Sequence, residues 1–380
     1  MKRYLIKLAT GIILMAIVGA LVFTGCTEEE EPPPPPPPPV EEEEEPPPPP
    51  PVEEVWEWPE KLFLVSGPGM GVEALTGWTA LMSADTGMQI RIVEIDNTLL
   101  RFKWIAQGRF FHNIDGNATT VEYLEASLGN NLRDTGPFQV RVLWAASQSN
   151  LGYMTRGDSD IKTVHDIKPG TKIVEWTFGA AMETTYSALL AWAQVDWDDI
   201  IWVPASNFPI IPRLITGGQA DLTFFFPTAG FTYEAEATPE GISWIELPAD
   251  EDPEGAKRYL EKQPTHSFGT ISLGVPSAIG VRGLDMLSPL LSSADSDPDL
   301  VYHYIKWMDE NYDRYKDTHA NNLSMTLDNT MRIMETSFIP AHEGLVRYLT
   351  ELGKWTPAHE ARNQQNIALL NRYVEAYQEA

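Results

Sequence analysis

The sequence predicts an α/β protein with mostly parallel sheets and a group of bracing helices at its C-terminus. Three observations support this prediction. Between residues 61 and 247, short apolar segments alternate with segments of helical period, an order typical of parallel sheets with helices on both faces. After about residue 283 the alternation stops and helical segments follow. The length of 380 residues suits two domains, or one large domain with two lobes.

The first half of the folded region alternates regularly. Residues 61–66 (KLFLVS) are a short apolar run that ends at glycines and predicts a strand, whereas residues 72–85 have a helical period. Residues 89–95 (QIRIVEI) predict the next strand, and residues 98–107 predict a helix that ends at Gly108. Further strands are expected at residues 138–146, 151–155, 172–176, 200–203, 221–226 and 241–247.

Strand ends and glycines also delimit the helices predicted later in the chain. A helix is expected over residues 182–194, directly after a strand, and another over residues 208–215, which ends at Gly217-Gly218. The C-terminal helices are expected at residues 299–311, 343–353 and 358–377. Helices gathered at the end of an α/β chain usually brace its sheets from outside.

Composition excludes several classes of protein. Asp and Glu number 54 against 27 Lys and Arg, so the net charge is −27, whereas nucleic-acid binding needs a basic surface. The single cysteine, Cys26, cannot form an internal disulfide or supply a cysteine-based zinc site. Much of the excess charge lies in residues 27–60, which contain no Lys or Arg.

The N-terminus has the pattern of an export signal. Basic residues precede an apolar run at residues 8–23, which is short for a membrane span of about 20 apolar residues. Small residues directly before Cys26 resemble the lipobox of bacterial lipoproteins. That resemblance implies a signal peptide at residues 1–26 and a lipid on Cys26 that anchors the protein to the outer face of the cell membrane. An uncleaved signal anchor is the alternative, and both place the remaining chain outside the cytoplasm.

Residues 27–58 predict a disordered tether. Runs of glutamate and proline fill this segment and cannot bury a core. Polyproline is extended, so the segment would reach on the order of 100 Å and hold a folded domain away from the membrane. A ligand for an SH3-type domain is a sharper alternative, but it does not suit an extracytoplasmic setting.

The first candidate binding loop joins the first strand to the first helix. It contains Ser66, Gly67, Gly69, Met70 and Gly71. Free backbone N–H groups at a helix N-terminus bind anions, and glycines let a ligand approach the backbone. The spacing is G-x-G-x-G with a valine where a dinucleotide fingerprint has its third glycine, so a small-molecule anion or a plain tight turn is favoured over a nucleotide.

Two more loops follow strands and have similar potential. One begins at Trp176 and opens the helix at residues 182–194, and the other follows the strand at residues 221–226. Open α/β sheets bind ligands beyond the carboxyl ends of their strands, so the three loops could line one cleft. The residues singled out in these two loops are Trp176, Thr177, Phe178, Ala181, Glu183, Thr184, Phe225 and Thr228.

Catalytic and metal-binding motifs are absent from the sequence. Neither His342-Glu343 nor His359-Glu360 is followed by the second histidine of a zinc-protease motif, and there is no nucleophile elbow and no P-loop. We therefore expect no enzyme activity, no metal and no cofactor.

Three segments resemble the solute receptors of the TAXI family, the binding subunits of TRAP transporters. Residues 161–170 (IKTVHDIKPG) resemble a family segment that follows a strand crossing between lobes. Residues 301–311 (VYHYIKWMDEN), with His319 downstream, resemble a family helix, and residues 340–353 (PAHEGLVRYLTELG) resemble the near-terminal family motif most specifically. The resemblance covers about residues 61–356 in the same order.

The resemblance implies a type II periplasmic-binding-protein fold, in which a ligand lies between two lobes that close over it. It implies delivery of that ligand to a TRAP-type permease, with an ABC-type receptor, a tethered sensor or adhesion domain, or an exported enzyme as the alternatives. The lobes would comprise residues 59–155 with 271–380, and residues 156–270.

Residue correspondence with the family is partial. The first loop is shorter than the family's, the family's ligand loop falls at Asp115-Gly116-Asn117, and the second loop keeps Glu183-Thr184. Asp115 and Asn117 therefore join the candidate ligand residues. Family relatives favour amino acids and small carboxylates, but the changed loops and nearby aromatic residues favour a less polar, aromatic organic acid here. The candidates for a carboxylate-binding arginine are Arg101, Arg109, Arg141 and Arg213, each expected at the surface.

Overall fold

A computed structural model of the chain describes residues 56–67, 70–125, 136–178 and 181–379. The predicted signal, its lipid site Cys26 and nearly all of the predicted tether lie outside the described residues. The chain from Trp56 to the C-terminus forms one compact unit. In the part that the structure describes, no helix is long and apolar enough to cross a membrane.

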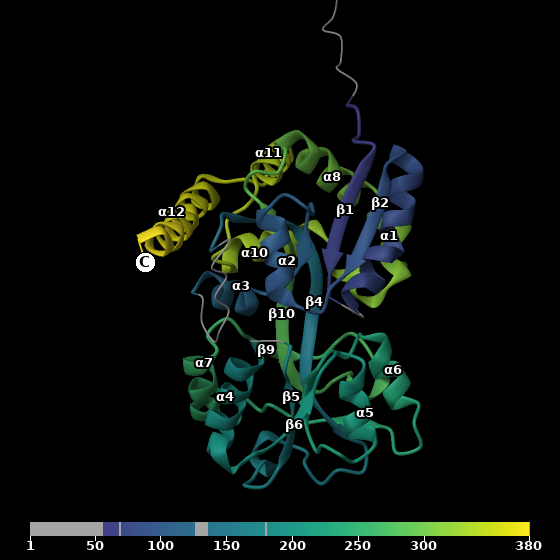
Figure 1. Cartoon of the computed structure of the whole chain (residues 1–380), viewed down its shortest axis with the longest axis vertical. Helices are drawn as coiled ribbons and strands as arrows, with labels where there is room; N and C mark the ends of the chain where they lie inside the picture. The colour runs from purple at the N-terminus through teal and green to yellow at the C-terminus, as the bar shows by residue number, and fades with distance from the viewer. Residues whose placement is uncertain (1–55, 68–69, 126–135, 179–180, 380) are drawn as a thin grey trace, which may run out of the picture. The chain divides into compact units, whose positions relative to one another are not determined.

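Strands and helices alternate along most of this unit (Figure 1). The strands are β1 Lys61–Ser66, β2 Gln89–Glu94, β3 Asn113–Ile114, β4 Val140–Arg156, β5 Lys172–Trp176, β6 Ile201–Ala205, β7 Thr223–Phe225, β8 Ile242–Trp244, β9 Phe268–Thr270 and β10 Arg282–Ser293. The helices are α1 Met70–Thr86, α2 Thr98–Ala106, α3 Asn117–Leu124, α4 Ala181–Ala193, α5 Ile210–Thr216, α6 Gly230–Glu236, α7 Pro253–Lys262, α8 Pro298–Glu310, α9 Tyr312–Tyr315, α10 Leu327–Thr336, α11 Glu343–Glu351 and α12 Pro357–Glu379.

Two separate hydrophobic cores confirm the α/β class and the two-lobed architecture. The core of lobe 1 combines residues from Leu62 to Ala146 with residues from Leu290 to Leu370. The core of lobe 2 is formed by residues from Leu151 to Leu284, in one stretch of chain. The exact lobe boundaries given above stay a prediction, but the cores divide the chain close to them.

The largest sheet is antiparallel, which corrects the prediction of mostly parallel sheets. Parallel pairing occurs where it was expected, between β1 and β2 in lobe 1 and between β5 and β6 in lobe 2. The six-stranded sheet has the order β3-β10-β4-β7, with β8 also on β4 and β9 on β10, and its pairs are all antiparallel. The alternation of strands and helices predicted each element's type but could not predict this pairing between distant segments.

Strand β4 is continuous and passes from one core to the other. The sequence predicted two strands here, at residues 138–146 and 151–155, separated by the polar residues 147–150. The structure instead has one strand of 17 residues, which pairs with β10 from Val140 to Leu151 and with β7 and β8 beyond that (Figure 1). The polar residues lie between the two cores, where a strand continues through backbone hydrogen bonds without burying apolar side chains.

Strand β10 was not predicted, because its sequence RGLDMLSPLLSS contains Gly283 and Pro289. Pro289 cannot donate a ladder hydrogen bond, and the β4–β10 register shifts between Ser288 and Pro289, where β4 has one extra residue. A β-bulge at this point removes the need for the missing N–H group and increases the local twist. The two crossing strands therefore change direction close to the passage between the lobes.

Side-chain caps fix the starts of the bracing helices. The Asp297 side chain accepts a hydrogen bond from Asp299 N at the start of α8, with proline in the first turn. At the start of α11, His342 Nδ1 accepts a hydrogen bond from Gly344 N at 3.1 Å. An added Cβ on Gly344 would lie 2.6 Å from the Pro298 carbonyl oxygen, so glycine permits close packing of α11 on α8. Two residues of the motif at residues 340–353, His342 and Gly344, therefore have structural roles: they start α11 and let it pack on α8.

Candidate functional site

The first predicted loop is compact at its strand end. Ser66 is buried, and an added Cβ on Gly71 would lie 2.1 Å from Ser66 Oγ, so a side chain at position 71 would force the Ser66 hydroxyl to move. An added Cβ on Gly67 would lie 3.2 Å from a guanidinium nitrogen of Arg101. Gly69 and the Met70 side chain lie outside the described part of the chain. In the described part of this loop, the glycines at positions 67 and 71 present backbone near the carboxyl end of β1.

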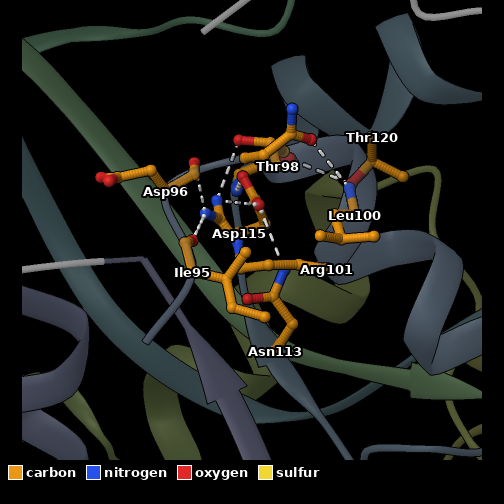
Figure 2. A network of polar contacts seen from close by, with 10 residues as sticks. Ile95, Asp96, Thr98, Leu100, Arg101, Asn113, Asp115 and Thr120 are labelled. Carbon is orange, nitrogen blue, oxygen red and sulfur yellow. Dashed lines mark hydrogen bonds and ion pairs between the residues drawn. The ribbon is translucent and has the colours of Figure 1, made fainter. Parts of the chain in front are cut away.

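Arg101 is buried and ties the loops after β2 and β3 together (Figure 2). Its Nη1 donates to the carbonyl oxygens of Ile95 at 2.6 Å and Asp96 at 3.0 Å. Its Nη2 donates to Thr98 Oγ1 at 2.9 Å and to Asp115 Oδ2 at 3.1 Å. These contacts use the hydrogens of both terminal nitrogens, so Arg101 is committed to the protein rather than to a ligand.

Asp115 is likewise occupied by protein groups. Besides Arg101, its Oδ2 accepts a hydrogen bond from Asn113 Nδ2 at 3.1 Å, and its Oδ1 accepts one from Gly116 N at 3.1 Å. The side chains of Arg101 and Asp115 are 8% and 10% exposed. In this geometry Asp115 shapes the turn before α3, while the side chain of Asn117, the neighbouring candidate, lies outside the description.

The surface positions expected for the four arginines are corrected in two cases. Arg101 and Arg141 are buried, whereas Arg109 and Arg213 are exposed as expected. Arg141 Nη1 donates to Gln139 Oε1 at 2.9 Å, and burial lowers the pKa of Arg141 to about 10. Both buried arginines satisfy backbone or side-chain acceptors of their own lobe. Most of these acceptors are within six residues in the sequence, but the sequence pattern did not show that the chain folds back to surround the guanidinium groups.

Aromatic side chains gather at the carboxyl ends of β5 and β7 in lobe 2. Trp176 stacks on Phe178 with ring centroids 5.7 Å apart, and Phe208 stacks on Phe225 at 4.8 Å. Trp176 and Phe208 meet edge to face at 5.5 Å, and Phe226 lies 5.7 Å from Phe208. Phe178 and Phe226 are half-buried, whereas Phe225 is completely buried. We call these five residues the aromatic wall.

The remaining candidates of lobe 2 differ in exposure. Thr177 and Glu183 are exposed, and Thr184 is half-buried. Thr177 Oγ1 donates to the Ala205 carbonyl oxygen at 2.9 Å, which ties the loop after β5 to the end of β6. Thr228 is buried next to the start of α6. The side chain of Ala181 is outside the description.

Glu73 of lobe 1 contacts the helix that follows the third predicted loop, the one after β7 in lobe 2. It lies in the first turn of α1, and an added Cβ on Gly230, at the start of α6, would lie 2.7 Å from Glu73 Oε1. Helices α3 and α4, one from each lobe, also approach each other. The helix after the first predicted loop therefore meets the helix after the third, whereas the helix after the second, α4, meets α3. Glu73 was not singled out from the sequence, because an acid in a first helical turn is common.

Asn150 marks the passage between the lobes and was also missed. Its Oδ1 accepts hydrogen bonds from Ser272 N at 2.8 Å, Ser272 Oγ at 3.0 Å and Leu273 N at 3.1 Å. Its Nδ2 points to Asp285 Oδ1 at 3.5 Å on β10. Asn150 is buried and therefore links β4, β10 and the segment after β9 at the hinge. The polar gap in the strand pattern was the available signal.

Buried histidines have structural surroundings. His112 Nε2 lies 2.6 Å from Tyr304 Oη, and burial lowers the pKa of His112 to about 3. His266 Nδ1 lies 2.8 Å from Tyr259 Oη, and burial lowers its pKa to about 3 as well. No group of His, Cys, Asp and Glu among the described residues is arranged to hold a metal ion.

A pocket of about 500 Å³ lies elsewhere on lobe 1. Its lining includes Lys61 at the start of β1, Arg109 after α2, and Asp295 after β10. None of its lining residues belongs to the predicted loops, which follow the carboxyl ends of β1, β5 and β7. This pocket is therefore distinct from the predicted ligand site.

Two cores joined by the crossing strands β4 and β10 define a two-lobed α/β fold, that of the type II periplasmic binding proteins. A family model described as NMT1-like matches residues 117–353, and the chain belongs to this family.

Solved structures with a similar fold share little sequence with this chain. A structure titled "Structure of a periplasmic transporter" is 13% identical over 83% of this chain and 97% of its own, with a TM-score of 0.49. The aliphatic sulphonate binding protein SsuA from Escherichia coli is 13% identical over 83% and 88%, with a TM-score of 0.42. Lactococcal OpuAC, complexed with glycine betaine, is 10% identical over 84% and 99%, with a TM-score of 0.41. A search of curated proteins found no match.

Proposed function

We propose that this protein captures a small organic acid or amino acid with an apolar or aromatic body and delivers it to a TRAP-type permease. The observation that carries the ligand class is the aromatic wall, whose half-buried members Phe178 and Phe226 directly follow strands β5 and β7 of lobe 2. Ligand pockets are lined mainly by apolar and aromatic side chains, with a few polar groups that fix orientation.

The polar end of the ligand is assigned to the backbone at the starts of α1 and α4. Both helices are long and follow glycine- or alanine-containing turns, and free N–H groups at such positions donate hydrogen bonds to an anion. Arg101 is excluded as the clamp because both of its terminal nitrogens donate to protein oxygens. A ligand held by backbone at one end and by aromatic rings at the other fits a less polar acid better than glutamate.

A thermal-unfolding screen tests this ligand class. The full-length chain in detergent is heated, with tryptophan fluorescence as the signal, against phenylpropionate, aliphatic acids, aromatic amino acids and glutamate. A ligand at 100 times its dissociation constant stabilises the folded state by about 2.7 kcal/mol. Stabilisation by glutamate alone, with no effect of any apolar acid, would overturn the proposed ligand class. Mass spectrometry of the denatured protein first checks for a ligand retained during purification.

Phe178→Ala and Phe226→Ala refine the same test. Each removes one ring from the aromatic wall, and we expect each to weaken the binding of an aromatic acid several-fold. Glu335→Gln on α10 is a surface control, because Glu335 is exposed and belongs to lobe 1, whereas the aromatic wall belongs to lobe 2. Equal affinity of all three variants would show that the wall does not contact the ligand.

The proposed permease partner rests on the resemblance at residues 301–311 and 340–353. An ABC-type permease is the second candidate, and membership of the NMT1-like family supports it. Reconstitution of ligand uptake with each type of membrane subunit separates them. Uptake driven by an ion gradient supports the TRAP-type partner, and uptake that requires ATP supports the ABC type.

The proposed anchor is a lipid on Cys26 at the end of a tether spanning residues 27–58. Metabolic labelling with a clickable fatty acid should mark the wild-type chain and leave Cys26→Ser unmarked. If the wild-type protein keeps residues 1–25 and carries no lipid, the uncleaved anchor is supported instead.

A further inference from the structure

Glu73 and Gly230 meet where lobe 1 touches lobe 2. Glu73 belongs to α1, whose neighbouring residues Ala74 and Leu75 are buried in lobe 1. Gly230 begins α6, directly after Ala229, which is fully buried in lobe 2. The backbones of both residues are therefore fixed to their own cores, and a contact between them reports the separation of the lobes.

The space at Gly230 is too small for a side chain. A Cβ there would lie 2.7 Å from Oε1, 3.4 Å from Cδ and 3.5 Å from Oε2 of Glu73. A distance below 3.0 Å is shorter than real Cβ contacts, so either the carboxylate or the lobe must move. Gly230 does not have a positive φ angle, so the backbone conformation gives no separate reason for glycine.

The Glu73 carboxylate is held in place by lobe 1. Glu73 Oε2 lies 3.4 Å from His319 Nε2, and the His319 side chain is only 14% exposed. His319 Nδ1 accepts a hydrogen bond from Asn321 N at 3.1 Å, so in the neutral ring the hydrogen is on Nε2 and faces Glu73. Asn322 Nδ2 donates to the Ala74 carbonyl oxygen at 3.2 Å, which ties this segment back to α1. The Glu73 side chain is 40% exposed, so its 3.4 Å contact with His319 is its support in lobe 1, while its Oε1 faces Gly230 of lobe 2.

We propose that Glu73, supported by His319, is the closure stop of this receptor and that Gly230 is the surface it meets. The stop sets how far the lobes close and so determines the size of ligand that both lobes can contact at once. This inference rests on the proposed function, since closure over a ligand is the step it controls. Glu73 is a positioning residue in this proposal: it does not contact the ligand but limits how closely the two lobes approach each other.

The first test measures lobe separation without any ligand. Spin labels are placed on full-length chains carrying Cys26→Ser, at Leu352→Cys in lobe 1 and Ile201→Cys in lobe 2, both exposed positions. Gly230→Val should shift the distance distribution toward larger separations, because its side chain meets the Glu73 carboxylate. Adding Glu73→Ala should reverse the shift, whereas adding the control Glu335→Ala should not.

Two results would overturn the closure stop. Gly230→Val could leave the distances unchanged, which would mean that the lobes do not meet at this point in solution. Alternatively, the shift could persist after Glu73→Ala, which would assign the clash to another group. Far-ultraviolet circular dichroism of each variant establishes that it is folded, and Gly230→Ala provides a milder substitution should valine prevent folding.

The second test uses phenylpropionate as the binding probe. Gly230→Ala should weaken its binding about five- to thirtyfold, the range that one or two kcal/mol produces, and Glu73→Ala should restore most of the affinity. His319→Gln should lessen the effect of Gly230→Ala, since an unsupported carboxylate can move aside. If phenylpropionate binds and Gly230→Ala has no effect on it, the closure stop is wrong while the proposed function stands. If no acid or amino acid binds the wild type, the proposed function fails, and the spin-label distances still decide the closure stop.

Discussion

Replacing Arg101 with methionine should destabilise lobe 1 strongly. Methionine keeps the length of the side chain but removes the guanidinium that holds the loops after β2 and β3 (Figure 2). Asp115 would keep two weaker donors, from Asn113 and Gly116, and lose its charged partner. The carbonyl oxygens of Ile95 and Asp96 would lose their donor as well.

The expected loss follows from the burial of this ion pair. Both side chains are at most 10% exposed, so solvent cannot replace the missing interactions easily. Breaking a buried ion pair by removing one partner costs about 3–5 kcal/mol, because the remaining charge stays buried without compensation. Whole proteins are stable by only about 5–15 kcal/mol, so Arg101→Met should remove a large part of the stability.

Urea unfolding at neutral pH measures this loss. Arg91→Met is the matched control, since Arg91 lies on the neighbouring strand β2 and is exposed. We expect a loss of about 3 kcal/mol or more for Arg101→Met and less than about 0.5 kcal/mol for Arg91→Met.

The double variant Arg101→Met/Asp115→Asn separates charge from hydrogen bonding. Removing the second charge should recover part of the lost stability, because a neutral amide is less costly to bury than a carboxylate. The reasoning is refuted if Arg101→Met and Arg91→Met have equal stabilities. It is also refuted if the double variant is less stable than Arg101→Met by the full cost of a second independent substitution.

Three further predictions address other parts of the fold. Burial lowers the pKa of His112 and His266 to about 3 and that of His342 to about 4, so the unfolded chain takes up their protons first as pH falls. Below about pH 6.5 each histidine should therefore remove roughly 1.4 kcal/mol of stability per pH unit, measurable as a falling unfolding midpoint, and a midpoint that is flat between pH 6.5 and 5 would contradict this. Gly344→Ala should cost about 1–3 kcal/mol in urea unfolding by pushing α11 from α8, and an unchanged midpoint would refute that packing. Asn150→Ala should cost at least about 1–3 kcal/mol, because buried donors at the hinge lose their acceptor, and unaltered hydrogen exchange at residues 272–273 would contradict this.

The local elements could be predicted from sequence because their signals are local. Strand β5 was predicted with its observed bounds, and α8 and α11 were predicted within two residues at each end. Apolar periodicity, capping residues and glycines act over a few positions, and those positions are adjacent in the sequence.

The pairing of β4 with β10 could not be predicted in the same way. Its partners Trp144 and Leu290 are far apart in the sequence, and Pro289 made the second strand resemble a loop. The candidate site shows the same division. The positions of the loops at strand ends followed from the alternation of elements. The burial of Arg101, in contrast, depends on how the loop after β2 turns its carbonyl oxygens toward the guanidinium, and the sequence pattern does not specify that conformation.

The path of the chain through the two cores has a consequence for the export that the N-terminal sequence predicts. Lobe 2 is made from a single stretch between Leu151 and Leu284, whereas the core of lobe 1 joins residues before Ala146 to residues after Leu290. A chain that emerges from its N-terminus can therefore assemble lobe 2 as soon as that stretch has crossed the membrane.

Lobe 1 must wait for residues as late as Leu349 and Leu370, which complete its core. During that interval β1, β2 and the first half of β4 present apolar surface with no permanent partner, the situation in which chains aggregate. The first half of lobe 1 is thus the part of the newly exported chain that most needs a chaperone outside the cytoplasm.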